Sequence, residues 1–462
     1  NYKSFVPCLG YTKDEILKII TIRDAMSANS FQKYIPTTIA TDVSDETVAV
    51  IMENLDGLDG ITIAEDTVRR YVDGKYFSQI IGYTGKVSAE ELTELQEENP
   101  DYAANDIVGK TGIEQAMETT LQGTKGAETV YVDNLGRVIE STNYVEPVAG
   151  NDVYLTIDKD LQMAAYNILE QNIAGILVSK IRNVKEYTPS ENASSSSIII
   201  PIYDVYFALF DNDVIDISHM ASENALENEQ LIYQKFEDQR ENVLNQIYEE
   251  MYETNTVYSK LTKEYKSYET YIIEDLLTAK GILVKDSIDT QDETYLAFQE
   301  GSISMSEYLK YAISSNWIEV SKLDVISDYA DSQEIYDKLS DYIQKTLPTQ
   351  KEFSKLILKY LIKNDKISGK MICNVLCEQE IITISEEDLT ALNSGRITAY
   401  QFMIDRITNL EITPAQLALD PFSGSMVITD VNTGDVLALV SYPSYGNNKM
   451  ANGVDAEYFA DI

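Results

Sequence analysis

The chain of 462 residues has few of the residue types that build several familiar kinds of site. It contains three cysteines, Cys8, Cys373 and Cys377, one histidine, His219, and one tryptophan. Such an odd and sparse set of cysteines excludes a disulfide framework. A structural zinc site needs about four nitrogen or sulfur ligands close together, which this composition does not supply. We therefore predict no metal site and no cofactor. Cys373 and Cys377 are expected to be buried on one helix face.

Positive charge and long apolar runs are also scarce. The 36 Lys and Arg residues face 76 Asp and Glu residues, which gives a formal net charge of −40. A surface of this charge repels phosphate backbones, so nucleic-acid binding is not expected. The longest apolar run, Ile198 to Phe210, contains Pro201 and Asp204 and is too short to span a bilayer. Hydrophobic residues nevertheless make up 44% of the chain, which is enough for real cores.

Residues 1–150 mix the patterns of helices and short strands. Capping patterns at Thr12–Glu15 and Val43–Glu46 predict two helix starts. Ile61–Ile63 and Thr129–Val132 are typical of strands. Turns are expected at residues 82–85 and 134–137. The region therefore has the character of an α+β fold.

The pattern changes after residue 150. Asp152–Ile157 predicts a strand, and Asp158 is placed to cap a helix that follows it. A polar break, Thr188–Ser197, precedes a long region that is helical nearly throughout, up to about residue 410. Apolar residues recur there at intervals of three and four; examples are Leu231, Phe236, Val243, Ile247 and Met251. No fixed repeat period is recognised, so a solenoid is not predicted.

The last forty residues predict a β-hairpin. Gly424–Asp430 alternates apolar and polar residues, as a half-buried strand does. Asn432–Asp435 has the composition of a turn, and Val436–Val440 predicts a second strand. Ser441–Tyr445, which contains a proline, is expected to leave the sheet.

Several separated segments resemble one protein family, the class B penicillin-binding proteins, and most closely their elongation-type penicillin-binding protein 2 members. The segments that resemble the pedestal (dimerisation) domain are Arg69–Tyr71, Ile81–Gly85, Val108–Glu114, Leu121–Gly126 and Val132–Arg137. Leu155–Gln162 resembles the entry into the transpeptidase domain, and Gly424–Tyr445 resembles the next hairpin of that domain.

The resemblance implies an α+β fold with a large helical insertion. The pedestal would cover residues 1–150, and the first strand and helix of the transpeptidase domain would cover 151–185. The insertion would span residues 186–410, and the next hairpin would lie within 411–462. Asp152–Glu170 and Ser425–Val440 would then lie side by side in one sheet-and-helix unit. Because the chain starts at Asn1 rather than Met, we expect a piece of a longer protein. Because it ends at Ile462 before a Ser-x-x-Lys motif follows the hairpin, we expect the piece to be truncated before the catalytic Ser-x-x-Lys.

The resemblance also implies a function. Such proteins are peptidoglycan D,D-transpeptidases, in which a serine is acylated by one stem peptide or by a β-lactam. It further implies a SEDS-type glycosyltransferase partner, a membrane anchor upstream of this stretch, and a location on the extracytoplasmic face of the bacterial cell membrane. An alternative of another class is a cell-wall assembly scaffold, in which the pedestal and the insertion dock partner proteins.

Three short strings match the catalytic motifs of this family by chance. They are Ser30–Lys33, Ser27–Asn29 and Lys110–Gly112. The Ser-x-Asn string comes directly before the Ser-x-x-Lys string, and this order does not suit the chemistry. We therefore assign no catalytic residue in this chain.

Two further strings suggest ligand sites only superficially. Gly109–Thr111 would be a phosphate loop if a glycine stood five residues earlier, where Ala104 is found. Asp211–Asp216 lacks the glycine that a calcium loop needs at its sixth position. We assign no cofactor-binding and no metal-binding residue. Trp317 is expected in a core, and His219 is expected in ordinary packing beside Ile217 and Met220.

Overall fold

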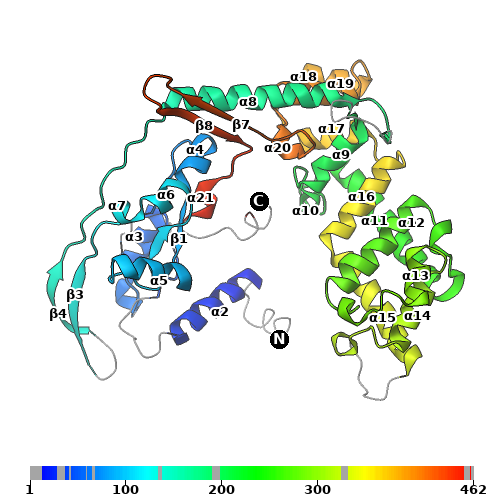
Figure 1. Cartoon of the computed structure of the whole chain (residues 1–462), viewed down its shortest axis with the longest axis horizontal. Coiled ribbons are helices and arrows are strands. Elements are labelled where there is room, and N and C mark those ends of the chain that lie inside the picture. The colour runs from blue at the N-terminus through cyan, green and yellow to red at the C-terminus, as the bar shows by residue number, and fades with distance from the viewer. Residues whose placement is uncertain are drawn as a thin grey trace. The chain divides into compact units, whose positions relative to one another are not determined.

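The computed structural model describes residues 13–28, 37–40, 43–58, 60–64, 68–133, 138–189, 198–323, 331–451 and 458. The chain divides into two compact units. Unit 1 comprises residues 1–163, 427–440 and 444–462, and unit 2 comprises residues 164–426 and 441–443. The described residues form helices and four two-stranded sheets joined by turns and loops, which confirms the α+β class (Figure 1).

Short elements build the N-terminal part of unit 1. They are α2 (Lys13–Ala28), α3 (Asp45–Glu53), η1 (Leu55–Gly57), α4 (Gly74–Ile81), β1 (Thr84–Lys86), α5 (Ala89–Glu98), β2 (Ile107–Gly109), α6 (Gly112–Ala116), α7 (Glu118–Leu121), β3 (Ala127–Val132) and β4 (Val138–Val145). Strand β1 pairs antiparallel with β2, and β3 pairs antiparallel with β4. The predicted start of α3 is confirmed, since the Ser44 side chain accepts a hydrogen bond from the Thr47 amide.

Three local predictions in unit 1 are wrong. Ile61–Ile63 and Asp152–Ile157 form no strand, and Thr84 and Gly85, the second half of the turn predicted at residues 82–85, belong to β1. A strand exists only where a second strand completes its ladder of hydrogen bonds, and three or four apolar residues cannot specify that partner. The predicted strand at Thr129–Val132 is confirmed within β3. The turn predicted at residues 134–137 lies outside the described residues.

Helix α8 (Lys159–Lys180) runs from unit 1 into unit 2. Its start is confirmed, because the Asp158 carboxylate accepts a hydrogen bond from the Leu161 amide at 2.8 Å. A short strand, β5 (Ile181–Arg182), follows and pairs in parallel with β6 (Ile200–Pro201). Most of the predicted polar break, residues 190–197, lies outside the described residues.

Helices dominate unit 2, as the sequence predicts. They are α9 (Ile202–Asp211), α10 (Ile217–Met220), α11 (Glu227–Glu249), η3 (Glu250–Thr254), η4 (Tyr258–Lys260), α12 (Lys263–Tyr271), η5 (Ile272–Thr278), η6 (Lys285–Ser287), α13 (Glu293–Gln299), α14 (Met305–Ser314), η7 (Val320–Lys322), α15 (Ser332–Thr346), η8 (Leu347–Thr349), α16 (Lys351–Lys363), α17 (Gly369–Glu378), α18 (Glu386–Ser394), α19 (Ala399–Thr408) and α20 (Pro414–Leu417). One continuous core joins them and includes Trp317, Phe353 and Phe402. Leu231, one of the apolar residues of the predicted helical pattern, is exposed, and its neighbour Ile232 is buried instead.

The helices from α16 to α20 are joined by a recurring junction. Each junction has a residue with positive φ, and these residues stand 15 positions apart, at Asp365, Glu380, Gly395 and Leu410. The isoleucine two positions after each of them, at 367, 382, 397 and 412, turns toward the core. The prediction of no fixed repeat is therefore wrong. Four different residue types occupy the positive-φ position, so the spacing of the isoleucines is the clearer sign of the repeat in the sequence.

The predicted hairpin is present near the C-terminus. Strand β7 (Gly424–Thr429) pairs with β8 (Val436–Tyr442). Between them, the Asp430 carboxylate accepts hydrogen bonds from the amides of Asn432 and Thr433, and Gly434 has a φ of 80°. Strand β8 extends two residues further than predicted and ends directly before Pro443. A short helix, α21 (Asn447–Met450), follows.

Candidate functional site: the anchorage of the C-terminal hairpin in unit 1

The side chain of Gln162, in the first turns of α8, ties three elements together. Its Oε1 accepts a hydrogen bond from the Leu439 amide at 2.8 Å, and its Nε2 donates to the Leu439 carbonyl at 2.8 Å. The same Nε2 donates to the Tyr76 carbonyl at 2.9 Å. The Gln162 side-chain amide thus forms the same two hydrogen bonds with the backbone of Leu439 that a residue of a neighbouring strand would form. It also holds α4, so Gln162 is a buried connector between α8, β8 and α4.

The residues just before α8 form hydrogen bonds with the first residues of β8. The Thr156 hydroxyl donates to the Val436 carbonyl at 2.7 Å, and the Asp158 amide donates to the Leu437 carbonyl at 2.9 Å. The expectation that the segment entering α8 lies beside the C-terminal hairpin is therefore confirmed for the residues in unit 1. One side-chain bond and one amide bond are too few for a ladder, which explains why residues 152–157 are not a strand.

Residues around α21 bind the backbone of the N-terminal part of unit 1. Asn448 exchanges two hydrogen bonds with the backbone of Tyr71, at 2.8 and 2.9 Å. Asn447 donates to the Gly82 carbonyl at 3.2 Å, and the Tyr445 hydroxyl donates to the Ser78 carbonyl at 2.8 Å. Asn447 is fully buried. This attachment depends on main-chain carbonyls and on side-chain amides rather than on a large apolar core.

The backbone that Asn447 binds belongs to a glycine-rich corner, which contains Gly82 and Gly112. Gly82 and Gly112 have φ values of 80° and 61°. A side chain at Gly112 would collide with the Ile80 carbonyl, 2.5 Å from the position of its Cβ. The Lys110–Gly112 string is thus the corner that leads from β2 into α6. The Gly109–Thr111 string, which resembles a phosphate loop only superficially, lies at the turn that starts α6.

Charged groups inside this corner are paired within it. The Lys110 ammonium contacts the Glu91 carboxylate at 2.6 Å, and Arg69 contacts Glu114 at 3.0 Å. Glu118 accepts hydrogen bonds from the Gly109 amide at 2.7 Å and from the Tyr102 hydroxyl at 3.1 Å. Burial raises the pKa of the Glu118 carboxyl. These pairs hold the corner together.

The other strings singled out in the sequence do not come together. Ser30–Lys33 and Asn29 lie outside the described residues, and Ser27 lies near the end of α2. In the string that suggested a calcium loop, Asp213 is bound by the ammonium groups of Lys351 and Lys355, at 2.9 and 3.3 Å. Among the residues that the structure describes, no group of three or more His, Cys, Asp and Glu side chains is arranged to hold a metal ion.

Three predictions about rare residues have different outcomes. Trp317 is buried in the core of unit 2, as expected. Cys373 and Cys377 lie on one side of α17, as expected, but only Cys373 is buried and Cys377 is half-buried. Burial raises the pKa of the Cys377 thiol to about 11, so it is a poor nucleophile. The prediction for His219 is wrong, because its side chain is 40% exposed and pairs with Glu229. Its apolar neighbours Ile217 and Met220 lie on a helix of one turn, where flanking residues do not define a buried face.

Sequence reasoning did not single out the residues that make the anchorage. Gln162 ends the Leu155–Gln162 string, but nothing in that string says which backbone the amide binds. Asn447 and Asn448 have partners some 370 positions away, and no local pattern identifies such pairs. Their only signal is that polar side chains follow a strand that ends at a proline.

Residues 3–155 match the model of the family described as "Penicillin-binding Protein dimerisation domain". The N-terminal third of the chain is a penicillin-binding protein dimerisation domain. Hence α4 to α7 and the hairpin β3–β4 are parts of this dimerisation domain, and Asn447 and Asn448 bind to it.

Curated relatives are similar over this domain and somewhat beyond it. The "Peptidoglycan D,D-transpeptidase MrdA" of Salmonella typhimurium (strain SL1344) is 28% identical over 204 residues, which cover 44% of this chain and 31% of the relative. The MrdA protein of Escherichia coli (strain K12) is 33% identical over 146 residues, covering 31% and 23%. "Penicillin-binding protein 2A" of Bacillus subtilis (strain 168) is 31% identical over 168 residues, covering 36% and 23%.

The chain thus spans less than a third of the length of these relatives. Among solved structures, penicillin-binding protein 2B from Streptococcus pneumoniae (strain 5204) is 26% identical, with a TM-score of 0.28. The match covers 37% of this chain and 28% of that one. The chain is homologous to the penicillin-binding protein 2 transpeptidases. Within the described ranges, no helix has both the length and the apolar composition needed to cross a membrane.

Proposed function

We propose that this chain is the non-catalytic part of a peptidoglycan D,D-transpeptidase that cross-links cell-wall stem peptides and binds penicillin. Its own role is to hold the dimerisation domain against the hairpin β7–β8. The observation that carries the proposal is the match of residues 3–155 to the dimerisation domain, together with relatives named as peptidoglycan D,D-transpeptidases.

The geometry of unit 1 supports this role. Asn447, Asn448 and Tyr445 follow directly after β8 and bind α4 and its flanking backbone. Gln162 binds β8 and α4 at once. A domain that continues from the hairpin would therefore have its first sheet held at a fixed place on the dimerisation domain. We further propose that residues 186–410 are an insertion between the first helix of the transpeptidase domain, in residues 151–185, and its hairpin, in residues 411–462.

A fluorescent penicillin tests the activity. The whole protein should be acylated at one serine, and residues 1–462 alone should remain unlabelled, because no serine in this stretch is assigned as the nucleophile. An unlabelled whole protein, or a labelled serine within residues 1–462, would overturn the assignment. Competition with unlabelled penicillin separates acylation of a single site from nonspecific labelling.

The role of the anchorage is tested separately. Asn448→Ala removes two hydrogen bonds to the Tyr71 backbone and should slow acylation of the whole protein, since the hairpin would be less firmly placed. Thr390→Ala changes an exposed side chain of α18 and is the matched control. Equal acylation rates for both variants and the unchanged protein would contradict a positioning role.

We also propose the location and partners that this family resemblance implies. The protein would act in cell-shape maintenance, anchored to the extracytoplasmic face of the bacterial cell membrane, beside a SEDS-type glycosyltransferase. Unit 2, with its own large core, could serve there as a docking scaffold for a further protein. Co-purification of the whole protein with the glycosyltransferase, with and without residues 186–410, tests both ideas. Loss of the partner only without the insertion favours the scaffold, and retention in both favours the dimerisation domain.

A further inference from the structure

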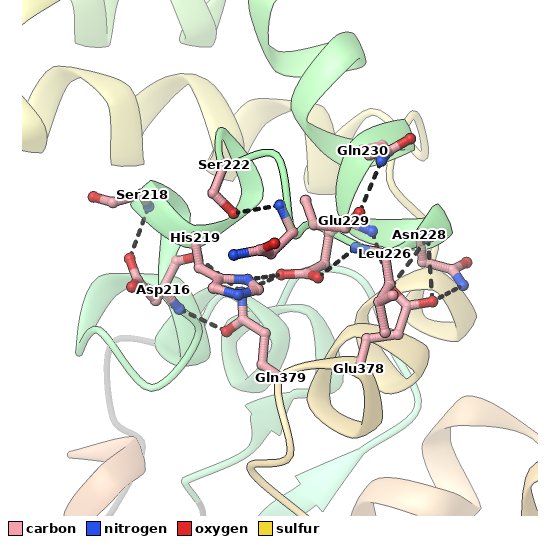
Figure 2. Close-up of polar contacts among 12 residues, drawn as sticks. Asp216, Ser218, His219, Ser222, Leu226, Asn228, Glu229, Gln230, Glu378 and Gln379 are labelled. Atoms are coloured by element: carbon pink, nitrogen blue, oxygen red, sulfur yellow. Dashed lines mark hydrogen bonds and ion pairs between the residues drawn. The ribbon is translucent and has the colours of Figure 1, made fainter.

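His219 meets two other elements of unit 2 at one buried carboxylate (Figure 2). Its Nδ1 lies 2.7 Å from Oε1 of Glu229, the third residue of α11, which is fully buried. The Nε2 of Gln379, just after α17, donates to the same Oε1 at 2.8 Å. The Leu226 amide donates to the other carboxylate oxygen at 2.8 Å. One carboxylate thus receives donors from α10, from the start of α11 and from the end of α17.

Gln379 extends this arrangement back to the start of α10. Its Oε1 accepts a hydrogen bond from the Asp216 amide, and its Nε2 donates to the Asp216 carbonyl, each at 2.9 Å. Glu378 accepts hydrogen bonds from the Asn228 and Glu229 amides and so caps α11 from the neighbouring helix. The contacts in this cluster bridge residues up to 163 positions apart. They fix the position of the short helix α10.

The charged residues around the His219 imidazole are all acidic. The pocket beside it is lined by Asp216, Asn224, Leu226, Glu378, Gln379 and Glu380, none of which is cationic. Asp216 faces His219 from the start of α10, Glu229 from α11, and Glu378 and Glu380 from the end of α17. His219 is also the single histidine of the chain. Its protonation is therefore the one change near neutral pH that adds a positive charge among these carboxylates.

We propose that the His219–Glu229 pair is a pH-sensitive latch that holds α10 against α11 and α17 in mildly acidic conditions and loosens as the pH rises. The neutral imidazole keeps a hydrogen bond to Glu229 when its proton is on Nδ1, but it no longer balances the buried carboxylate charge. Loosening is therefore a weakening of the attachment of residues 216–226, and unit 2 as a whole stays folded.

The direction follows from linkage. The hydrogen bond and the charge of Glu229 raise the pKa of His219 above its ordinary 6.5. Stabilisation by His219 is complete below the unfolded value and is lost as the pH rises through the folded value. Burial opposes ionisation of Glu229, but hydrogen bonds from Leu226, Gln379 and His219 lower its pKa below the ordinary 4.5. The latch is therefore closed at pH values above the lowered pKa of Glu229 and below the raised pKa of His219.

The imidazole resonance of His219 in the full chain tests the latch directly, since no second histidine overlaps it. Its titration midpoint should lie above 6.5, and Glu229→Gln should lower it. Glu378→Gln is the control, because Glu378 bonds the backbone of α11 rather than the imidazole and should change the midpoint less. A midpoint at or below 6.5, or equal shifts in both variants, would overturn the proposal.

Hydrogen exchange gives a second readout that does not require Glu229 to be changed. After correction for intrinsic exchange, protection of amides in residues 216–226 should fall with rising pH, by at most about tenfold per pH unit. In His219→Gln the side chain can still donate but cannot titrate, so this pH dependence should disappear. Equal pH dependence in this variant and in the unchanged chain would exclude His219 as the switch.

Discussion

At the scale of single residues, buried polar side chains connect segments that are far apart in the sequence. Gln162 is 1% exposed and satisfies both backbone groups of Leu439 as well as the Tyr76 carbonyl. A buried amide is acceptable only when its donors and acceptors are paired, and here the pairing is supplied by two different elements. The same requirement makes such a residue sensitive to substitution.

Gln162→Leu should loosen the hairpin. The leucine keeps most of the volume but removes three hydrogen bonds, and the expected loss is about 1–3 kcal/mol. Hydrogen exchange of the β8 amides measures it locally. Gln171→Leu is the control on the same helix, because Gln171 makes one exposed bond to the Thr408 carbonyl. Equal effects of the two substitutions on β8 would contradict the connecting role of Gln162.

Glu269 should make unit 2 less stable at high pH. It is 3% exposed, and burial, followed by repulsion from Glu250, raises its pKa to about 8. The folded state therefore keeps a proton that the unfolded state has already lost above about 4.5. Stability should fall as the pH rises from that value toward 8, by up to about 1.4 kcal/mol per pH unit.

Denaturant unfolding at several pH values measures this slope. Glu269→Gln should flatten the fall in stability, because the amide stays neutral throughout. Glu253→Gln, at an exposed position in the same unit, should leave the slope as it was. If the slope survives in Glu269→Gln, another group is responsible for it.

At the scale of elements, the four junctions from α16 to α20 follow one pattern. A helix ends at a residue with positive φ, an isoleucine two positions later enters the core, and Ser368, Thr398 or Thr413 then caps the next helix. Helical periodicity and caps are local properties, so the sequence predicts the helices. The isoleucines recur in the sequence at this spacing, but the residue with positive φ differs at every junction, so the repeat is read most directly from the backbone.

Two glycines should respond in opposite directions to the same substitution. Gly395 ends α18 with a φ of 78°, and Gly175 lies within α8; a Cβ at either position meets nothing within 4 Å. Gly395→Ala should therefore cost about 1–2 kcal/mol of backbone strain. Gly175→Ala should instead stabilise by about 0.5–1 kcal/mol. Thermal unfolding of both variants measures the difference, and the same sign for both would refute the conformational argument.

At the scale of the whole molecule, charge is the dominant feature. The chain carries a net charge of −40 from 36 Lys and Arg and 76 Asp and Glu residues, and some of the cationic residues form ion pairs with acidic ones. Examples are Lys110 with Glu91 and Lys351 with Asp213. Most carboxylates therefore repel one another across the surface, and such self-repulsion destabilises a compact state.

Added salt should raise the melting temperature. The Debye length falls from about 10 Å at 0.1 M to about 3 Å at 1 M, which screens repulsion between exposed carboxylates more than it weakens close pairs. Calorimetry in NaCl over this range measures the change, and KCl should act equally because the effect is one of ionic strength. A melting temperature that falls with NaCl would mean that surface ion pairs outweigh the repulsion.

The sequence by itself determined the helices of unit 2, the hairpin β7–β8 and the resemblance of the first 150 residues to a dimerisation domain. These features rest on periodicity, turn residues and ordered strings, all of which act over short distances along the chain. Only the tertiary structure decided that Gln162, Asn447 and Asn448 anchor the hairpin and that His219 pairs with Glu229. Those contacts depend on which backbone groups remain unpaired after folding, and no local pattern records that.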